Sequence, residues 1–382
     1  MLSGMVSGTK VMQLNLQAVY QAVRRLRPVS RAELARRLGT TKPTMGRAID
    51  ALLAAGLIRE ADASGYGAVF FEPCPDAAVV LGLDVGSRYL RGTVADLDGR
   101  QLARRDLPLA SCEPATVVAK AVQLRDQLVA EAEVDGVALA AAGVGGVIDP
   151  RTGRVRVANQ HELNGFAAGA QLRLALGVPV LVENEVNLAA VGEGWRGAGA
   201  GLRDFAFLAV GSGVGAGLVL AGELHRGHNG AAGEIDFVRP GRDFEPSSPA
   251  ADSFLAHAET RLRRTEDTIL RNPLTTESIM DAARAGDRLA TSLIRVEADR
   301  IARCATTLTQ VVDLELVVLG GGVGLNGDLL LDPVRTALNS LTPYPPRVEI
   351  SQLGAGATLT GAVALALRAV AEDLVPSRVA TG

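Results

Sequence analysis

A strand that runs into a glycine-rich turn and then into a second strand occurs twice in this chain of 382 residues. The first copy covers residues 79–86 and 89–96, and the second covers residues 205–210, the turn at 211–217 and the strand after it. Helix-forming segments and a further apolar strand follow each copy. This repetition predicts two α/β lobes around a cleft. Glycine turns at strand ends let backbone N–H groups approach phosphates, although a single one is equally an ordinary tight turn.

The repeat also sets the expected domain boundaries. The first lobe is expected at 79–196 and the second at 197–355, and residues 1–75 precede them as a separate N-terminal domain. A helix at 356–372 is expected to return to the first lobe. Residues 373–382 are expected to form a flexible tail.

Charge separates the N-terminal domain from the rest of the chain. Residues 1–72 contain ten Lys/Arg and five Asp/Glu, a net charge of +5, so that with −3 for the whole chain the remainder carries −8. A basic head on an acidic body predicts that only the head meets a polyanion.

The pattern of the head is that of a winged helix-turn-helix. Apolar spacing predicts a helix that ends before Pro28, a second over 31–38 capped by Ser30, and a third capped by Thr41. Two short strands around a tip at 64–67 follow. In this arrangement the third helix enters the major groove of DNA.

Five residues of the head are expected to contact DNA. Polar and basic side chains on the second and third helices would meet phosphates and base edges. They are Arg31, Thr41, Lys42, Thr44 and Arg47. The tip at 64–67 has no Arg or Lys, which leaves Tyr66 or the backbone for a minor-groove contact. The alternative reading of the head is a small dimerisation or protein-binding module.

Composition excludes several classes of protein. Apolar residues make up 48% of the chain and charged residues 21%, which is typical of a globular protein and not of a disordered one. No run approaches about 18 uninterrupted apolar residues, so no transmembrane helix or membrane partner is predicted, and no secretory signal is found. Cys74, Cys112 and Cys304 lie too far apart for a disulfide framework or metal cluster, which favours the cytoplasm.

Five segments of the body carry a family resemblance. They are LGLDVGSRYLRGTVADLDG at 81–99, AAGVGGVIDPRTGRV at 141–155, GVPVLVENEVNLAAVGE at 177–193, AVGSGVGAGLVLAGELHRGHNGAAGEI at 209–235 and VVLGGGVG at 317–324. In order and spacing they resemble the ROK family (repressors, open reading frames and sugar kinases) of the actin/hexokinase-like superfamily, over about 80–370. The resemblance implies an α/β fold class, with an N-terminal winged helix-turn-helix followed by a two-lobed actin/hexokinase-like body. An N-terminal winged helix is the usual mark of the family's repressor branch.

The resemblance implies a sugar site at Asn184, Glu185 and Glu234. In the family's kinases an asparagine holds sugar hydroxyls, an aspartate acts as general base and a glutamate binds the sugar. Here the base position is Glu185, one methylene longer than aspartate. A misplacement of about 1 Å can cost about 100-fold in rate, so no catalytic residue is assigned. A carboxylate can still accept hydrogen bonds from a sugar; the alternative is a carboxylate without a ligand.

The family's zinc motif is missing. Phe237 stands at the position of the family's histidine, and 239–249, in place of its cysteine-rich loop, contains neither Cys nor His. A closed zinc site needs four such ligands, so no metal is expected. His225 and His228 have no evident third ligand and are interpreted as surface residues.

The first phosphate turn is altered as well. Arg88 replaces the small hydroxyl residue of the kinases, whereas Asp84, which in the kinases would help place the metal-phosphate, is retained. The alternative, without a ligand, is that Asp84 and Arg88 pair within the lobe. The second glycine turn is intact, but it also shapes the lobe and does not by itself predict ATP binding. No cofactor is expected.

Three hypotheses remain open. The favoured one is a transcriptional regulator, most simply a repressor, that binds duplex operator DNA and senses a sugar or sugar derivative between the lobes. The others are a regulator with an empty cleft that answers to a partner protein, and an active ATP-dependent sugar kinase. Two-fold operator logic predicts a homodimer or a dimer of dimers.

Overall fold

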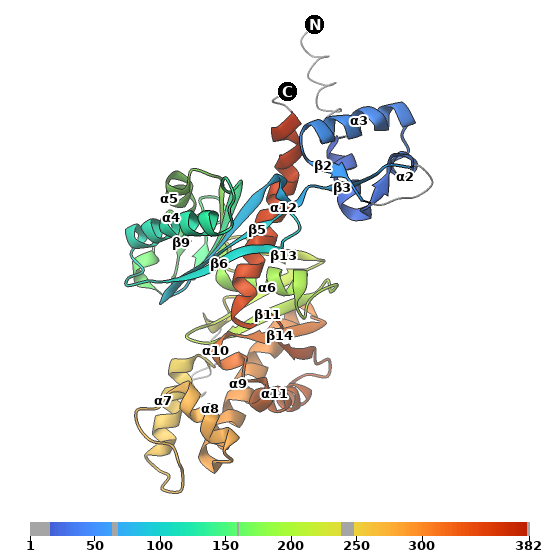
Figure 1. The fold of residues 1–382 in the computed structure, drawn as a ribbon. Coiled ribbons are helices and arrows are strands. Elements are labelled where there is room, and N and C mark those ends of the chain that lie inside the picture. Colours follow the sequence, from blue (N-terminus) through green and yellow to red (C-terminus); the bar gives the residue numbers. More distant parts are fainter. Residues whose placement is uncertain (1–15, 63–67, 159, 238–247, 380–382) are drawn as a thin grey trace.

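The computed structural model describes residues 16–62, 68–158, 160–237 and 248–379, which form a small head and a two-lobed body (Figure 1). The head begins with a helix over 16–26. It continues with β1 (Val29–Ser30), α2 (Arg31–Arg37), α3 (Lys42–Ala54), β2 (Ile58–Glu60) and β3 (Phe70–Pro73), whose strands pair in the order β1-β3-β2. This is the winged helix-turn-helix that the sequence predicts. The tip at 64–67, with Tyr66, lies outside the described residues.

Two capping residues begin the helices of the head where the sequence predicts. The Ser30 side chain accepts a hydrogen bond from the backbone N–H of Glu33, and that of Thr41 accepts one from the N–H of Thr44. Each cap satisfies a backbone donor that the first turn of a helix leaves free. One face of α3 is buried through Met45, Ile49 and Leu52.

The first lobe is a five-stranded mixed sheet. Its strands are β4 (Val79–Val85), β5 (Tyr89–Asp96), β6 (Gln101–Pro108), β7 (Leu139–Val144) and β10 (Val180–Asn184), in the order β10-β7-β4-β5-β6. Two helices, α4 (Pro114–Glu131) and α5 (Ala168–Leu176), share one buried apolar cluster with the sheet. The short hairpin β8 (Val147–Ile148) and β9 (Val155–Arg156) follows β7.

The second lobe repeats this plan. Its strands are β11 (Phe205–Val210), β12 (Val214–Leu220), β13 (Glu223–His225), β14 (Leu316–Gly320) and β15 (Arg347–Ile350), in the order β13-β12-β11-β14-β15. In both lobes three antiparallel strands are followed by two that run parallel to the first of them. The doubled strand–turn–strand pattern of the sequence therefore corresponds to two sheets of the same topology.

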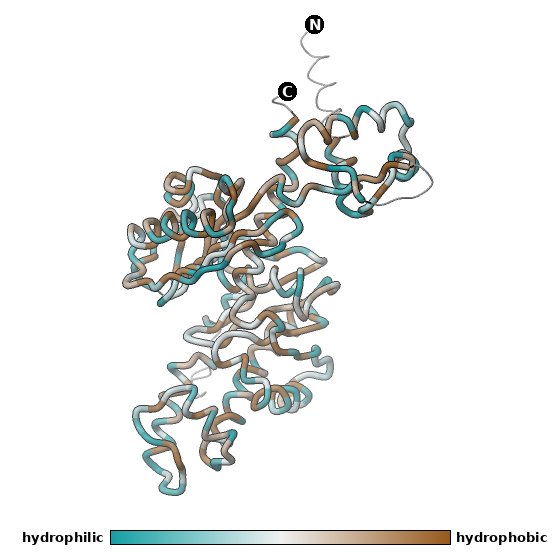
Figure 2. Tube along the Cα trace, viewed as in Figure 1, coloured by the Kyte–Doolittle hydropathy of each residue, from teal (hydrophilic) through white to brown (hydrophobic). Residues whose placement is uncertain are grey.

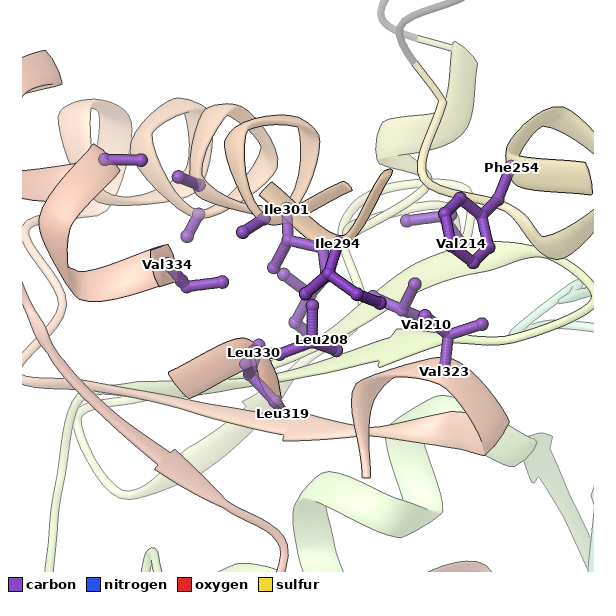
Figure 3. Close-up of a cluster of buried hydrophobic side chains, with 14 of the residues drawn as sticks. Leu208, Val210, Val214, Phe254, Ile294, Ile301, Leu319, Val323, Leu330 and Val334 are labelled. Carbon is purple, nitrogen blue, oxygen red and sulfur yellow. The ribbon is translucent and has the colours of Figure 1, made fainter. Parts of the chain in front are cut away.

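Helices cover the second sheet on its outer face. They are α7 (Ala251–Leu262), α8 (Thr276–Arg284), α9 (Arg288–Val312), α10 (Gly321–Gly324) and α11 (Gly327–Leu341). Figure 3 shows side chains of α9, such as Ile294 and Ile301, packed against Leu208 and Leu319 of the sheet. Apolar residues concentrate in the sheets and in the helices behind them, as the brown segments of Figure 2 show.

The C-terminal helix joins all three parts. Helix α12 (Ala357–Val379) packs against α6 (Glu185–Arg196), β4 and β7, and it contacts α3 of the head. Figure 1 shows it in red, running past the first lobe to the head. The expected flexible tail from residue 373 was wrong up to Val379, because Leu374 and Val375 are buried in the same cluster as the head's core. Residues 380–382 lie outside the described part.

The apolar character of α12 follows from this packing. Residues 354–379 form the one stretch among the described residues that is long and apolar enough to cross a membrane. Half of its 18-residue apolar window is buried inside the protein. A core helix of a soluble protein passes the same test of length and composition.

Two glycines let α6 and α12 touch backbone to backbone. A Cβ atom on Gly361 of α12 would lie 1.8 Å from the carbonyl oxygen of Leu188, and one on Gly192 of α6 would lie 2.4 Å from that of Ala357. Real Cβ contacts are never so short, so only glycine fits at either position.

Substituting Gly361 by alanine should therefore separate the two helices. We expect Gly361→Ala to lower the free energy of unfolding by about 1–3 kcal/mol, the usual cost of overpacking, in chemical denaturation of the full-length protein. Gly356→Ala is the matched control, since its Cβ would meet nothing within 4 Å. Equal stability of the two variants would contradict this account of the crossing.

Candidate functional site

A cleft of about 590 Å³ lies between the two lobes. The first lobe contributes the turn after β4 and the N-terminus of α6, and the second contributes the glycine turn at 211–215 and the region of Glu234. Asn184, Glu185 and Glu234 all line this one cleft. The structure thus brings together the three residues that the sequence predicts as a sugar site.

Asn184 is held by the fold itself. Its Oδ1 accepts hydrogen bonds from the backbone N–H groups of Val186 (2.8 Å) and Asn187 (3.1 Å), and its Nδ2 donates one to the carbonyl of Gly146 (3.0 Å). Asn184 is therefore the N-cap of α6, which begins at Glu185. One amide hydrogen remains for a ligand.

Glu183 ties the two lobes together behind Asn184. This buried carboxylate accepts a hydrogen bond from Asn187 Nδ2 (2.9 Å) and forms an ion pair with Arg226, which follows β13 of the second lobe. A buried carboxylate that lost its cationic partner would be left as an uncompensated charge. The pair therefore holds the β13 hairpin against the end of β10.

The expected pair of Asp84 and Arg88 is wrong. Asp84 is paired with Arg91, whose Nη1 lies 3.0 Å from Asp84 Oδ2. The reason is register: Asp84 lies directly opposite Arg91 in the antiparallel pair β4–β5, so both side chains project from the same face. Arg88 lies in the turn between these strands, exposed on the cleft wall, and has no ion-pair partner among the described residues.

Glu185 and Glu234 are harder to ionise than free carboxyl groups. Burial, with some repulsion from Asp84 and some relief from Arg91, raises the pKa of Glu185 to about 7. Burial, with repulsion from Asp236, raises the pKa of Glu234. Each group would gain from a ligand that donates hydrogen bonds to its charged form.

Gln160 is a cleft residue that sequence reasoning missed. It follows β9, lines the cleft near Glu185, and its buried Oε1 has no hydrogen-bond partner. No motif includes it, and a lone glutamine has no spacing pattern that would single it out. Arg91 was missed for a different reason, because only the strand register shows that it faces Asp84.

Part of the region in which the sequence predicts no zinc ligands lies within the described residues. His225 and His228 are exposed, as interpreted from the sequence. Within the described ranges no three His, Cys, Asp or Glu side chains are placed to hold a metal ion. The segment at 239–247 and the side chain of Phe237 lie outside those ranges, so the absence of zinc stays a prediction.

The head presents an exposed surface along the N-terminal half of α3. Lys42, Thr44 and Arg47 are exposed, and neither basic residue has an ion-pair partner within the described residues. Thr41 is exposed too, but its hydroxyl already caps α3. Arg31 forms an ion pair with Asp50 (3.1 Å) and lies 5.6 Å from the ring centre of Phe71, so it is partly committed to the head.

Contacts fix the head on the body at the turn after β5. Arg27 pairs with Asp98, and Arg24 Nη2 donates to the carbonyl of Leu97 (3.1 Å). From the other side, Arg196 at the end of α6 donates to the carbonyls of Asp98 (2.9 Å) and Gly99 (2.8 Å). The turn at 97–99 therefore lies between the first helix of the head and the C-terminal end of α6.

Comparison with known proteins agrees with this arrangement. The family model described as "ROK family" matches residues 80–369, and the model described as "Helix-turn-helix domain" matches residues 17–61. The chain belongs to the ROK family. The xylose repressor of Caldicellulosiruptor bescii is 23% identical over 94% of this chain and 96% of its own length. The glucokinase of Halalkalibacterium halodurans is 26% identical over 67% of this chain and 83% of its own length.

A solved structure shares the whole architecture of this ROK protein. It is a ROK family transcriptional regulator described as a homologue of the Escherichia coli MLC protein, with a TM-score of 0.83 over 97% of this chain and 100% of that one. At 20% sequence identity the match shows the fold alone. The predicted fold class, a winged helix-turn-helix followed by a two-lobed ROK body, is confirmed.

Proposed function

We propose that this ROK protein is a transcriptional repressor whose head binds operator DNA and whose cleft senses a sugar. The observation that carries the proposal is the pairing, in one chain, of a helix-turn-helix head with a cleft that retains Asn184, Glu185 and Glu234. Relatives named as xylose repressors, similar over nearly their whole length, support the same function. Since DNA is the partner, the protein acts in the cytoplasm.

The head suits DNA through α3. Lys42 and Arg47 lie on its exposed side, where no described residue pairs with their charges, which favours contact with phosphates and guanine edges. A Cβ on Gly46 would meet nothing within 4 Å, so the helix is bare at that point and a close approach to DNA is open. Two heads of a homodimer, or of a dimer of dimers, would read two half-sites.

The cleft suits a neutral sugar because it offers acceptors. Glu185 and Glu234 provide carboxylate oxygens from opposite lobes, and Asn184 provides one free amide hydrogen. A sugar brings many hydroxyl donors to such a site. The alternative function is that of a regulator that binds no sugar. It is supported by the three hydrogen bonds that Asn184 already makes within the protein.

We infer that the protein does not phosphorylate sugars at the rate of an enzyme. Arg88 occupies the turn that would hold phosphate, and Glu185 is longer than the usual base. Kinases among the relatives, such as the glucokinase named above, make this inference worth testing directly.

Helix α6 offers a route from the cleft to the head. Its 12 residues span about 18 Å, from Glu185 in the cleft to Arg196 at the turn beneath the head. A ligand that shifts the N-terminus of α6 would move this turn, and with it Arg27 of the head. The ligand can shift the head only as far as its affinities for the two arrangements differ.

The whole proposal is tested on DNA. Duplexes selected from a random pool should bind the full-length protein, and one member of a panel of neutral aldoses (D-xylose, D-glucose, D-galactose, D-mannose, L-arabinose, D-ribose) should change that affinity at least fivefold. If the protein binds DNA but no aldose binds or acts, sugar sensing is rejected and the empty-cleft regulator is the better description.

Arg47→Ala should weaken operator binding. Loss of one guanidinium that contacts a base costs about 1–3 kcal/mol, or roughly 5- to 150-fold in affinity, and should relax the preference at one position of each half-site. Wild-type affinity should fall steeply with salt, because bound phosphates release counterions. Fluorescence anisotropy measures both, with Arg105→Ala on the exposed face of β6 as the control. Wild-type affinity that ignores salt would contradict the DNA-binding role.

Phosphorylation of the aldose panel should be negligible. With ATP and Mg²⁺, a coupled ADP-release assay should give turnover far below about 1 per second, the lower end of common enzyme rates. The Halalkalibacterium halodurans glucokinase serves as the positive control. Turnover at an enzymatic rate would replace the repressor assignment of the body with that of a sugar kinase.

Asp98→Asn should uncouple the head from the cleft. It removes the charge that holds Arg27, while the exposed pair contributes at most about 1 kcal/mol to stability. We expect unchanged sugar affinity and DNA affinity, each measured alone, but a sugar effect on DNA binding reduced at least threefold. Asp126→Asn, an exposed carboxylate on α4, is the matched control. A normal sugar effect in Asp98→Asn would exclude this route.

A further inference from the structure

Two side-chain oxygen atoms that accept hydrogen bonds, one from Gln160 and one from Glu185, lie close to Gly145 at the wall of the cleft. A Cβ atom at Gly145 would lie 3.2 Å from Gln160 Oε1 and 3.5 Å from Glu185 Oε1. Gln160 Oε1 is buried without a partner, and the Glu185 carboxylate receives no hydrogen bond from any described residue. Two acceptor oxygens therefore lie near the same point of the cleft wall, and no described residue donates a hydrogen bond to either of them.

Two such acceptors favour a ligand that brings hydrogen-bond donors. A buried acceptor without a donor costs free energy, and a donor brought by a ligand recovers it. A hydroxyl group donates, whereas a phosphate, a carboxylate or a carbonyl brings only further acceptors. The oxygens of Gln160 and Glu185 thus favour hydroxyl groups of a ligand and disfavour an acidic or phosphorylated group beside them.

Ala158, two residues before Gln160, lies against the backbone of Gly146 at the wall of the cleft. The Cα of Ala158 lies 2.8 Å from where a Cβ of Gly146 would be, and its N–H donates to Asn164 Oδ1 (2.8 Å). Val157 has a φ of 48°, which is unfavourable for a β-branched residue, and its side chain is 57% exposed on the cleft wall. Strain and exposure of this kind concentrate at binding sites.

We propose that Gln160 Oε1 and Glu185 Oε1 form an acceptor niche beside Gly145 that binds two hydroxyl groups of the sugar, one donating to each oxygen, so that Gln160 is a specificity-determining residue. The niche deepens the proposed sugar sensing and rests on it. Its residue Gln160 is a contact that the family motifs do not include. The ligand class that the niche prefers is an aldose with unsubstituted hydroxyl groups at this position.

Protonation of Glu185 competes with the ligand. Asp84 of β4 and Arg91 of β5 are the charged groups that face it, and with burial they bring its pKa to about 7. Below that pH most of the Glu185 carboxyl is protonated and no longer offers a charged acceptor to a sugar hydroxyl. Sugar affinity should therefore fall on acidification, and between pH 8 and pH 6 the deprotonated fraction drops by roughly tenfold.

The test is calorimetric titration of the full-length protein with the aldose panel at pH 6 and pH 8. Gln160→Met removes the acceptor and keeps the side chain's length, so we expect at least tenfold weaker binding of the sugar that the wild type binds, and a smaller pH effect. Its melting temperature should equal or exceed that of the wild type, because a buried unpaired oxygen has been removed. Gln171→Met, exposed on α5, is the control.

Gly145→Ala gives a second, independent readout. The added methyl fills the niche without removing the amide, and should also weaken sugar binding at least tenfold, with Gly136→Ala as control because its Cβ would meet nothing within 4 Å. Wild-type-like affinity and pH dependence in Gln160→Met would overturn the niche while leaving sugar sensing intact. Failure of the wild type to bind any aldose would overturn both.

Discussion

The contact between α6 and α12 is the constraint on which the rest of the structure depends. Gly192 and Gly361 bring the two backbones to a distance that no other residue permits. Through it α6 is clamped between the lobes while α12 continues to the head, where Leu374 and Val375 share the head's apolar cluster. One crossing thus holds the cleft at one end of α6 and the support of the head at the other.

Within that frame the cleft combines rigid and unsatisfied groups. Asn184 and Glu183 are bound by hydrogen bonds and an ion pair that shape the fold, so they position the site more than they are free to change with a ligand. Glu185, Glu234 and Gln160 instead face the cleft with acceptors to spare. The separation of these roles suits a sensor, in which a ligand completes hydrogen bonds that the empty protein lacks.

The sequence predicted the elements that local chemistry controls. Capping by Ser30 and Thr41, the apolar stripe of α3 and the doubled strand–glycine turn were all readable, because each depends on residues within a few positions of one another. The errors involved distant partners. Asp84 was paired with a neighbour in the chain, Arg88, whereas strand register placed Arg91 opposite it. The last helix was ended too early, because its final turns are stabilised by the head, more than 300 residues away.

The sequence by itself determined the two-lobed α/β plan, the basic helix-turn-helix head and the identity of three polar residues at the cleft. The plan and the head follow from periodicity, charge and motif spacing, which are properties of short segments, whereas the three cleft residues follow from the resemblance to the family. Only the tertiary structure decided which of those residues are free for a ligand, that Gln160 joins them, and that α6 connects the cleft to Asp98 beneath the head. The physical reason is that hydrogen-bond partners and burial are set by segments far apart in the chain, and both decide whether a polar group supports the fold or waits for a ligand.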